Sequence, residues 1–214
     1  MPAYASSIDV LADEVVLVRH GETAWSSAGK HTGRTDLALD ERGRLEAEAL
    51  AEPLRERRFA LVLTSPLRRA IETCRLAGLG GQARVRQELS EWDYGSYEGR
   101  TTAEIRLEQP AWSLWREGVP GGESIEQVSA RADRVLAELD AAEGDVAVFA
   151  HGHILRVLTA RWLGLEPEAG RLLALDPATI SILGFEHETR VIRAWNEPCG
   201  VLAPRRRRGP IPTD

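Results

Sequence analysis

The sequence has little cysteine, a single lysine and no long apolar run. A membrane-spanning helix needs about 20 consecutive apolar residues, and no stretch approaches that length, so no spanning segment is expected. The first residues carry no basic segment followed by an apolar stretch, which argues against a secretory signal. The two cysteines, Cys74 and Cys199, lie far apart and fit no metal or redox spacing. These absences predict a cytoplasmic protein with free thiols.

A large excess of charge is also missing, since the formal net charge is -6. Composition therefore favours neither nucleic acid nor a membrane surface as a partner. Lys30 is the only lysine, and every other basic residue is arginine. We interpret this as a compositional bias, so the abundance of arginine alone indicates no anion site. A hydrophobic content of 43% over 214 residues is typical of a globular chain with one sizeable core or two small ones.

Apolar runs that are short and rich in valine or leucine predict buried strands, because helices show longer patterns. Such strands are expected, in chain order, at 14–19, 59–63, 83–86 and 146–150. Near the C-terminus, two segments predict an antiparallel pair that turns near His187 and Glu188, and they lie at 179–186 and 189–195.

Helical patterns lie between these strands. Asp40 is expected to cap a helix over 41–57, whose apolar face holds Leu45, Ala49, Leu50 and Leu54. Ser65 is expected to cap a second helix, with Pro66 as its first residue and Gly78 just past its end. The remaining predictions are a loop over 20–36, short helical pieces within 102–118, and helices over 125–142 and 154–163.

Strands that alternate with helices predict one α/β domain, a three-layer α/β/α arrangement with a mostly parallel sheet and an antiparallel edge. We place this domain at residues 14–197. Residues 1–13 are expected to be a loose lead-in. Residues 198–214 are expected to be a disordered Arg/Pro-rich tail, and the run Arg205–Arg208 is best explained as a solvated segment. A role for that run on an anionic surface is the alternative.

Polar residues follow three of the predicted buried strands. Arg19-His20-Gly21 lies at the end of the strand at 14–19, Ser65 to Arg69 follows the strand at 59–63, and His151-Gly152 follows the strand at 146–150. If these strands are parallel neighbours, their ends meet at one edge of the sheet, where open α/β sheets bind ligands. Two of these ends lead into helices, whose free N–H groups point at an anion placed there.

The residue types at this edge suit phosphoryl chemistry. A guanidinium grips phosphate oxygens with a rigid fork, and a neutral imidazole can attack phosphorus. His20 must be unprotonated at the attacking nitrogen, while His151 can assist as a cation, since imidazole titrates near about pH 6.5. The sequence does not show which ring nitrogen attacks. No metal is required by this set of residues.

Leu17-Val18-Arg19-His20-Gly21-Glu22-Thr23 resembles the signature of the histidine phosphatase superfamily, also called phosphoglycerate mutase-like. The resemblance spans residues 14–196 in the family's order. It continues through Trp25, Thr32-Gly33, Thr35-Asp36, Leu39, Gly43, Thr64 to Ala70, Glu91, Tyr94-Gly95, Glu98-Gly99, Gly121 to Ser124, and His151-Gly152. A lone Arg-His-Gly is a weak signal, but the whole series is specific.

The resemblance implies a role for each matching residue. His20 is the expected nucleophile, which carries the phosphoryl group as phosphohistidine. Glu91 is the expected general acid and then general base. Arg19, Arg69 and His151 are expected to hold the phosphate oxygens, together with Ser26 and Gly152. Of the adjacent arginines, Arg69 before Ala70 matches the family position. Contacts to the rest of the substrate are expected from Lys30, Thr32, Gly33 and Tyr94, although loop packing explains these residues as simply.

The sequence departs from many family members after the loop tryptophan, where Ser26 replaces asparagine. Serine still donates to a phosphate oxygen, but with a shorter reach. The segments 25–33 and 91–99 look more like the branch of broad-specificity acid phosphatases and sugar-bisphosphate phosphatases. The segment from Glu91 to His151 looks short for a cofactor-dependent mutase, and a shorter cap admits water, which favours hydrolysis.

These observations predict a metal-independent phosphatase of small phosphomonoesters, with sugar phosphates as one candidate group and no cofactor. One alternative is a phosphoglycerate mutase primed by a phosphorylated cofactor, and another is a non-catalytic phosphate-binding protein. A metal site at His151 and His153 is disfavoured, because no carboxylate or cysteine lies at a fitting spacing. The expected partner is a phosphorylated metabolite, with no nucleic acid and no membrane. Family members are often dimers, so a homodimer is a candidate assembly.

Overall fold

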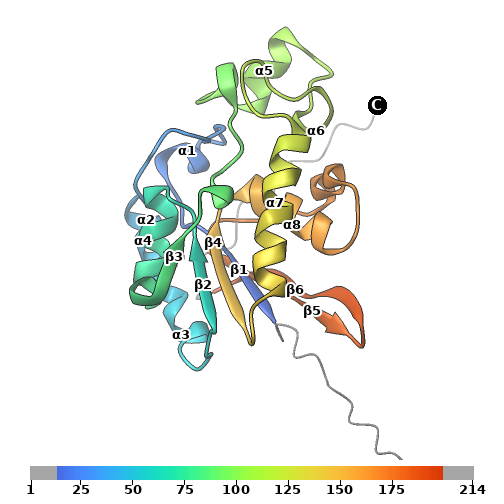
Figure 1. Cartoon of the computed structure of the whole chain (residues 1–214). Helices are drawn as coiled ribbons and strands as arrows, with labels where there is room; N and C mark the ends of the chain where they lie inside the picture. The colour runs from blue at the N-terminus through green and yellow to red at the C-terminus, as the bar shows by residue number, and fades with distance from the viewer. Residues whose placement is uncertain (1–13, 200–214) are drawn as a thin grey trace, which may run out of the picture.

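The computed structural model of the chain describes residues 14–199 (Figure 1). Its six-stranded sheet has the order β3-β2-β4-β1-β5-β6. The strands are β1 (Val15–Arg19), β2 (Leu61–Thr64), β3 (Ala83–Val85), β4 (Val146–Ala150), β5 (Thr179–Glu186) and β6 (Thr189–Pro198). The first four are parallel to one another, and β5 and β6 add an antiparallel edge. The predicted mixed α/β sheet is therefore confirmed.

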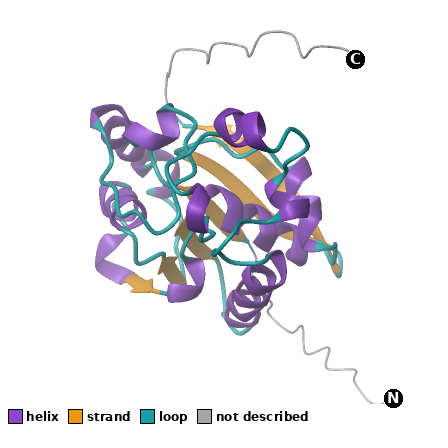
Figure 2. Cartoon of the chain, turned by 90° about the horizontal axis from the view of Figure 1, so that it is seen from above, coloured by secondary structure: helices purple, strands orange, loops and turns teal. Residues whose placement is uncertain are grey.

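The helices are, in chain order, α1 (Ala24–Ser27), α2 (Glu41–Ala49), α3 (Ala51–Leu54), α4 (Arg68–Leu76), α5 (Thr102–Glu108), α6 (Leu114–Glu117), α7 (Ile125–Asp140) and α8 (Gly152–Trp162). Four short 3₁₀ turns complete the described elements at Gly80–Gln82, Gln87–Leu89, Gly95–Tyr97 and Pro167–Leu172. Viewed from above, the sheet runs between helices on its two sides (Figure 2). None of the helices in residues 14–199 is long and apolar enough to cross a membrane.

Both faces of the central strands are buried, which explains their continuous apolar sequence. Val16 and Val18 face one side, where they pack with Leu50 from the turn between α2 and α3, Leu54 from α3 and Cys74 from α4. Val15 and Leu17 face the other side and pack against α7 and α8, whose buried residues there include Val128, Ala132, Val135, Ile154 and Leu158. The two cores hold β1 and β4 rigidly in the middle of the sheet, so the ends of these strands are well placed to carry a site.

The predicted helix over 41–57 is interrupted. It forms as α2 and α3, with a turn at Leu50. Pro53 lacks the N–H that would bond to the carbonyl of Ala49, so a continuous helix loses a bond there. The prediction that Leu45 is buried was wrong, since its exposed fraction is 61%. The buried face of α2 holds Gly43, Glu46 and Ala47 instead, because Glu46 Oε2 accepts a hydrogen bond from the Glu22 N–H at 3.0 Å.

Ser65 does not cap α4, which corrects a second prediction. The helix begins at Arg68 with Leu67 in the capping position, and no side chain caps it. The Ser65 hydroxyl instead accepts a hydrogen bond from the Leu67 N–H at 3.3 Å and lies 2.7 Å from His151 Nε2. Its position at the end of β2 thus serves the site and not the helix.

Other boundaries shift by a few residues. The short helix α1 lies in the segment 20–36, which was expected to be a loop, and β2 ends at Thr64, one residue later than expected. The helix α8 starts at Gly152, two residues early. The strand β6 extends through Pro198, where the tail was expected to begin. The predicted lead-in 1–13 and the rest of the tail, residues 200–214 with Arg205–Arg208, lie outside the described residues.

The turn after β1 lies directly against α2. A Cβ on Gly21 would lie 2.3 Å from the carbonyl oxygen of Gly43, and a Cβ on Gly43 would lie 2.0 Å from that of Glu22. Neither position has room for a side chain, because the colliding atoms are backbone. This close approach fixes the backbone on which His20 sits.

Candidate active site

The strand order places β4 between β1 and β2, so the carboxyl ends of these three parallel strands are adjacent. His20 follows β1, and its N–H donates to the carbonyl of Ala150 at 3.0 Å. The ring centroids of His20 and His151 lie 5.1 Å apart. Arg69, from the first turn of α4, lies 3.1 Å from His151 through its Nε atom. The structure thus brings together the residues that the strand ends predicted to converge.

The protonation of His20 follows from one hydrogen bond. Its Nδ1 lies 2.7 Å from the carbonyl oxygen of Gly21, which can only accept, so Nδ1 carries the proton and Nε2 carries the lone pair. Burial, followed by the charges of Arg69 and Arg19, holds the pKa of His20 well below 6.5. His20 is therefore a neutral imidazole with Nε2 as its nucleophilic atom.

His151 is neutral as well, which contradicts the expectation that it assists as a cation. Its Nδ1 accepts a hydrogen bond from Arg69 Nε, because a guanidinium has no acceptor. Its Nε2 then donates to the Ser65 hydroxyl at 2.7 Å. Burial, Arg69 and His20 together hold the pKa of His151 well below 6.5. The sequence could not show this state, because it depends on the side chains of α4 and β2.

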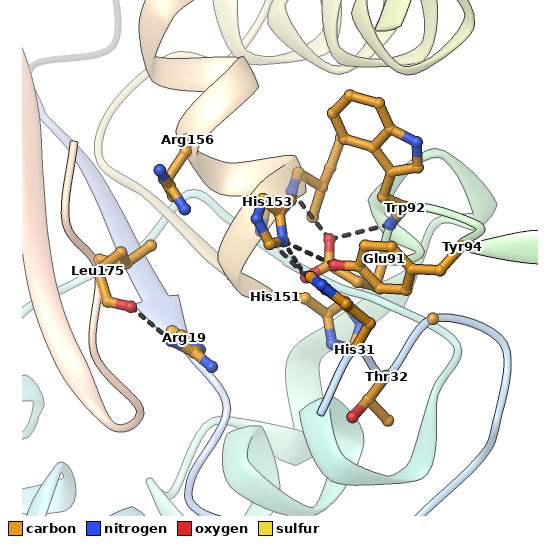
Figure 3. A network of polar contacts seen from close by, with 12 residues as sticks. Arg19, His31, Thr32, Glu91, Trp92, Tyr94, His151, His153, Arg156 and Leu175 are labelled. Atoms are coloured by element: carbon orange, nitrogen blue, oxygen red, sulfur yellow. Dashed lines mark hydrogen bonds and ion pairs between the residues drawn. The ribbon is translucent and has the colours of Figure 1, made fainter. Parts of the chain in front are cut away.

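The two arginines occupy different positions. Arg19 lines the cavity described below, and its Nη1 donates to the carbonyl of Leu175 at 2.5 Å (Figure 3). Arg69 is fully buried and does not line that cavity. Its Nη1 donates to the carbonyl of Thr35, and its Nη2 donates to the carbonyls of Thr32 and Gly33, each at 3.0 Å. Arg69 therefore holds the loop segment 32–35 and His151 in place. It supplies positive charge to the site without lining the cavity.

Glu91 lies on the loop before Trp92, and its carboxylate faces the first turn of α8 and accepts three backbone hydrogen bonds. They come from the N–H groups of Trp92 at 2.9 Å, His153 at 3.0 Å and Ile154 at 3.0 Å (Figure 3). Burial acts to raise the pKa of Glu91, but the backbone hydrogen bonds that it accepts, including the one from the His153 N–H, favour the carboxylate and hold this pKa below 4.5. Before substrate binds, Glu91 is a carboxylate.

A cavity of about 670 Å³ opens beside these groups. Eight of the predicted site residues line it: Arg19, His20, Ser26, Lys30, Thr32, Glu91, Tyr94 and Gly152. Other lining residues were not predicted, and they include Glu22, His31, Arg42, His153, Arg156 and Asp176. His151 and Arg69 lie behind this wall. The cavity has the size expected of a small-molecule site, for which about 300–1,000 Å³ is usual.

The loop residues predicted to touch substrate are largely engaged with the loop itself. Ser26 Oγ accepts from the Thr23 N–H at 2.8 Å as part of a capping box, and Thr32 Oγ1 donates to the carbonyl of Lys30 at 3.2 Å. The Gly33 N–H donates to Glu98 Oε1 at 2.9 Å, and Gly33 does not line the cavity. The geometry therefore gives no support to a substrate contact by Gly33.

Sequence reasoning missed two residues of α8. His153 was considered only as a metal ligand, yet its Nδ1 lies 2.6 Å from the Tyr94 hydroxyl. Arg156 lies over the Trp115 ring, 4.7 Å from its centroid, and donates to the carbonyl of Gly170 at 2.9 Å. His153 and Arg156 are three residues apart, so they lie on one face of a helix that starts at a strand end. This spacing could have predicted that both side chains face the cavity. Within residues 14–199, no group of three or more histidine, cysteine or carboxylate side chains is placed to hold a metal ion.

Comparison with known proteins shows the family of the chain. The sequence profile of the histidine phosphatase superfamily (branch 1) matches residues 15–198. An acid phosphatase of Mycobacterium tuberculosis is 44% identical over 180 residues, which cover 82% of this chain and 88% of that protein. A sedoheptulose 1,7-bisphosphatase of Saccharomyces cerevisiae is 35% identical over 233 residues, with 90% and 84% covered.

The solved structure of an open reading frame product of Mycobacterium tuberculosis matches with a TM-score of 0.82 and 42% identity, covering 87% of this chain and 98% of that chain. The match therefore extends over most of both molecules. The chain belongs to branch 1 of the histidine phosphatase superfamily and is a phosphatase of that superfamily.

Proposed function

We propose that this phosphatase hydrolyses small phosphomonoesters without a metal ion, through a phosphohistidine on His20. The observation that carries the proposal is the Nδ1–H···O=C bond of His20, which leaves Nε2 free to attack in a cavity shared with Arg19 and Glu91. Phosphoryl transfer needs positioning and neutralised charge more than strong acid or base, and these residues supply both.

In the first step, His20 Nε2 attacks phosphorus and the ester P–O bond breaks. The leaving oxygen takes a proton from Glu91, so an alcohol departs and phosphohistidine remains. A bound phosphate dianion places negative charge near Glu91, which raises the pKa of that carboxyl and lets it carry this proton. Arg19 and Gly152, the first residue of α8, stabilise the charge on the phosphoryl oxygens.

In the second step, Glu91 accepts a proton from water, and the hydroxide formed attacks phosphorus. The P–N bond to His20 breaks, inorganic phosphate is released, and Glu91 then gives its proton to solvent, which restores the carboxylate of the free enzyme. Arg69 and Ser65 contribute by holding His151 beside the His20 ring. Both steps use only groups of this chain and water.

Phosphorylated sugars are the substrate class that we favour. Relatives named as an acid phosphatase and a sedoheptulose 1,7-bisphosphatase support this choice, as does a polar cavity large enough for a sugar phosphate.

We also propose a cytoplasmic location and a homodimer. The free thiols of Cys74 and Cys199 support the first, and light scattering of the purified protein tests the second.

The test is hydrolysis of an aryl phosphate in the presence of a chelator, with wild type compared to His20→Ala. We expect turnover that is insensitive to chelator and a loss of at least about 1,000-fold in the variant, since the covalent route is removed. Equal rates for the two proteins would remove His20 from the mechanism, and chelator-sensitive turnover would restore a metal.

The same preparation separates hydrolysis from isomerisation. With 3-phosphoglycerate, supplied with and without the corresponding bisphosphate, we expect phosphate release to exceed formation of the isomer. The reverse order would identify a cofactor-dependent mutase.

A further inference from the structure

The imidazole of His153 lies between a phenol and the proposed general acid. Its Nδ1 is 2.6 Å from the Tyr94 hydroxyl and 3.8 Å from Glu91 Oε2. The first distance is a hydrogen bond and the second is too long for one. The backbone N–H of His153 separately donates to Glu91 Oε2 at 3.0 Å (Figure 3). One residue therefore holds the Glu91 carboxyl through its backbone and faces it with a titratable ring.

The Tyr94–His153 bond has a defined direction. Tyr94 is buried, with 2% exposure, and this burial raises the pKa of its hydroxyl well above 10. The hydroxyl therefore keeps its proton, and among residues 14–199 its one hydrogen-bond partner is Nδ1 of His153, so it donates to that nitrogen, which must be unprotonated to accept. A ring with a free Nδ1 lone pair is uncharged.

Charged groups from two other segments and from α8 itself face this ring. Glu91 lies on the loop before Tyr94, Arg19 comes from the end of β1, and Arg156 comes from the next turn of α8 itself. His31 packs nearby, with its ring centroid 6.3 Å from that of His153, and the Trp92 and Trp115 rings enclose the ring from the core side. Burial, with the two arginines, lowers the pKa of His153 against the opposing influence of Glu91.

We propose that Tyr94 and His153 are positioning residues for the proton on Glu91: the Tyr94 hydroxyl keeps the His153 ring uncharged, and an uncharged ring lets Glu91 hold the proton that it gives to the leaving alcohol. An imidazolium 3.8 Å from Oε2 would stabilise the carboxylate and withdraw the acid from use. This inference rests on the proposed general-acid role of Glu91.

The test compares two esters that differ in their need for an acid. The glycerol of glycerol phosphate leaves as a strongly basic alkoxide unless its oxygen is protonated. The para-nitrophenolate of para-nitrophenyl phosphate leaves without a proton. The measured quantity is the ratio of kcat/KM for glycerol phosphate to that for para-nitrophenyl phosphate, followed as a function of pH. Because both esters need the same unprotonated His20, its titration cancels in this ratio.

In Tyr94→Phe, the hydrogen bond that favours an unprotonated Nδ1 is lost, so His153 takes up a proton at a higher pH than in wild type, while burial and the two arginines still oppose its charge. We expect the ratio to fall about tenfold as the pH is lowered through this titration, at a higher pH than the corresponding fall of wild type, and to equal the wild-type ratio well above it. The matched control is Tyr97→Phe, which removes another buried hydroxyl, bonded to Gln109 Nε2 at 2.8 Å and away from the cavity. That control should leave the ratio unchanged at every pH.

A second variant keeps the inference testable if Tyr94→Phe fails to fold. His153→Asn replaces the titrating ring by a group that does not titrate, so the ratio should lose its fall at low pH, alone and in combination with Tyr94→Phe. A ratio in Tyr94→Phe that matches wild type, or that is lowered equally at all pH values, would overturn the inference. So would an unaltered low-pH fall in His153→Asn.

Glu91→Gln separates this inference from the function on which it rests. We expect this variant to lower the ratio at every pH. If it does not, the general-acid role of Glu91 is wrong and the inference falls with it. If Glu91→Gln lowers the ratio but Tyr94→Phe does not, only the inference is wrong.

Discussion

At the scale of single residues, the site depends on histidines that remain uncharged. The chain has five histidines, and His20, His31, His151 and His153 all have a lowered pKa, for which burial is the largest cause. For His31 the pKa falls to about 4. Since nearby arginines also lower the pKa of three of these rings, a nucleophile and its neighbours stay neutral in a site that attracts anions.

These lowered values make stability depend on pH. Below the unfolded pKa of about 6.5, the unfolded chain binds protons that the folded rings refuse, so the unfolding free energy falls as pH falls. The slope is about 1.4 kcal/mol per pH unit for each such histidine, until the folded pKa is reached. We expect the denaturant midpoint to drop between pH ~7 and pH ~5.

His31→Gln should flatten that slope, because it removes one group whose protonation differs between the folded and unfolded states. Glutamine is chosen because His31 Nε2 lies 3.3 Å from Thr102 Oγ1, a contact that the glutamine amide can approach. His187→Gln is the control, because His187 is exposed at the β5–β6 turn. A midpoint that stays constant over this range would contradict the neutral state assigned to the buried rings.

At the scale of elements, the contact between α2 and the turn after β1 positions the nucleophile. Gly43 and Gly21 allow the two backbones to touch, and the Gly21 N–H also donates to Thr73 Oγ1 of α4 at 3.1 Å. Two helices therefore hold the backbone next to His20. The partner of the Nδ1–H of His20 is the carbonyl of Gly21 itself, so a shift of this turn would alter the nucleophile directly.

Gly43→Ala tests this contact. The added Cβ would meet the backbone oxygen of Glu22 at 2.0 Å, so α2 or the turn must move. We expect a loss of about 1–3 kcal/mol in unfolding free energy, as for other overpacked sites, together with a fall in kcat.

Gly81→Ala is the matched control, because a Cβ at Gly81 meets nothing within 4 Å. Denaturant unfolding and aryl phosphate turnover of both variants give the comparison. If Gly43→Ala behaved like Gly81→Ala in both, the contact would not be what positions His20.

At the scale of the whole molecule, the sheet order brings together residues that are far apart in sequence. Apolar runs and the residues that follow them predicted this arrangement, because strands buried on both faces are easy to recognise and parallel strands end at one edge. The convergence of His20, His151 and Arg69 could therefore be predicted from the sequence.

Features that depend on side chains from several elements could not be predicted in this way. The neutral state of His151 depends on the guanidinium of Arg69 and the hydroxyl of Ser65, and nothing in the sequence indicated that Ser65 contacts His151. The burial of Glu46 in place of Leu45 likewise follows from a backbone contact across the fold. Local periodicity contains no information about such partners.

The central claim is that one imidazole carries the phosphoryl group during turnover. Rapid quenching of wild type with a radiolabelled phosphomonoester, followed by peptide mapping, tests it most directly. We predict an acid-labile, base-stable label on the peptide that contains His20, and no label in His20→Ala. Turnover without a label on His20, or a stable label on any other side chain, would contradict the claim.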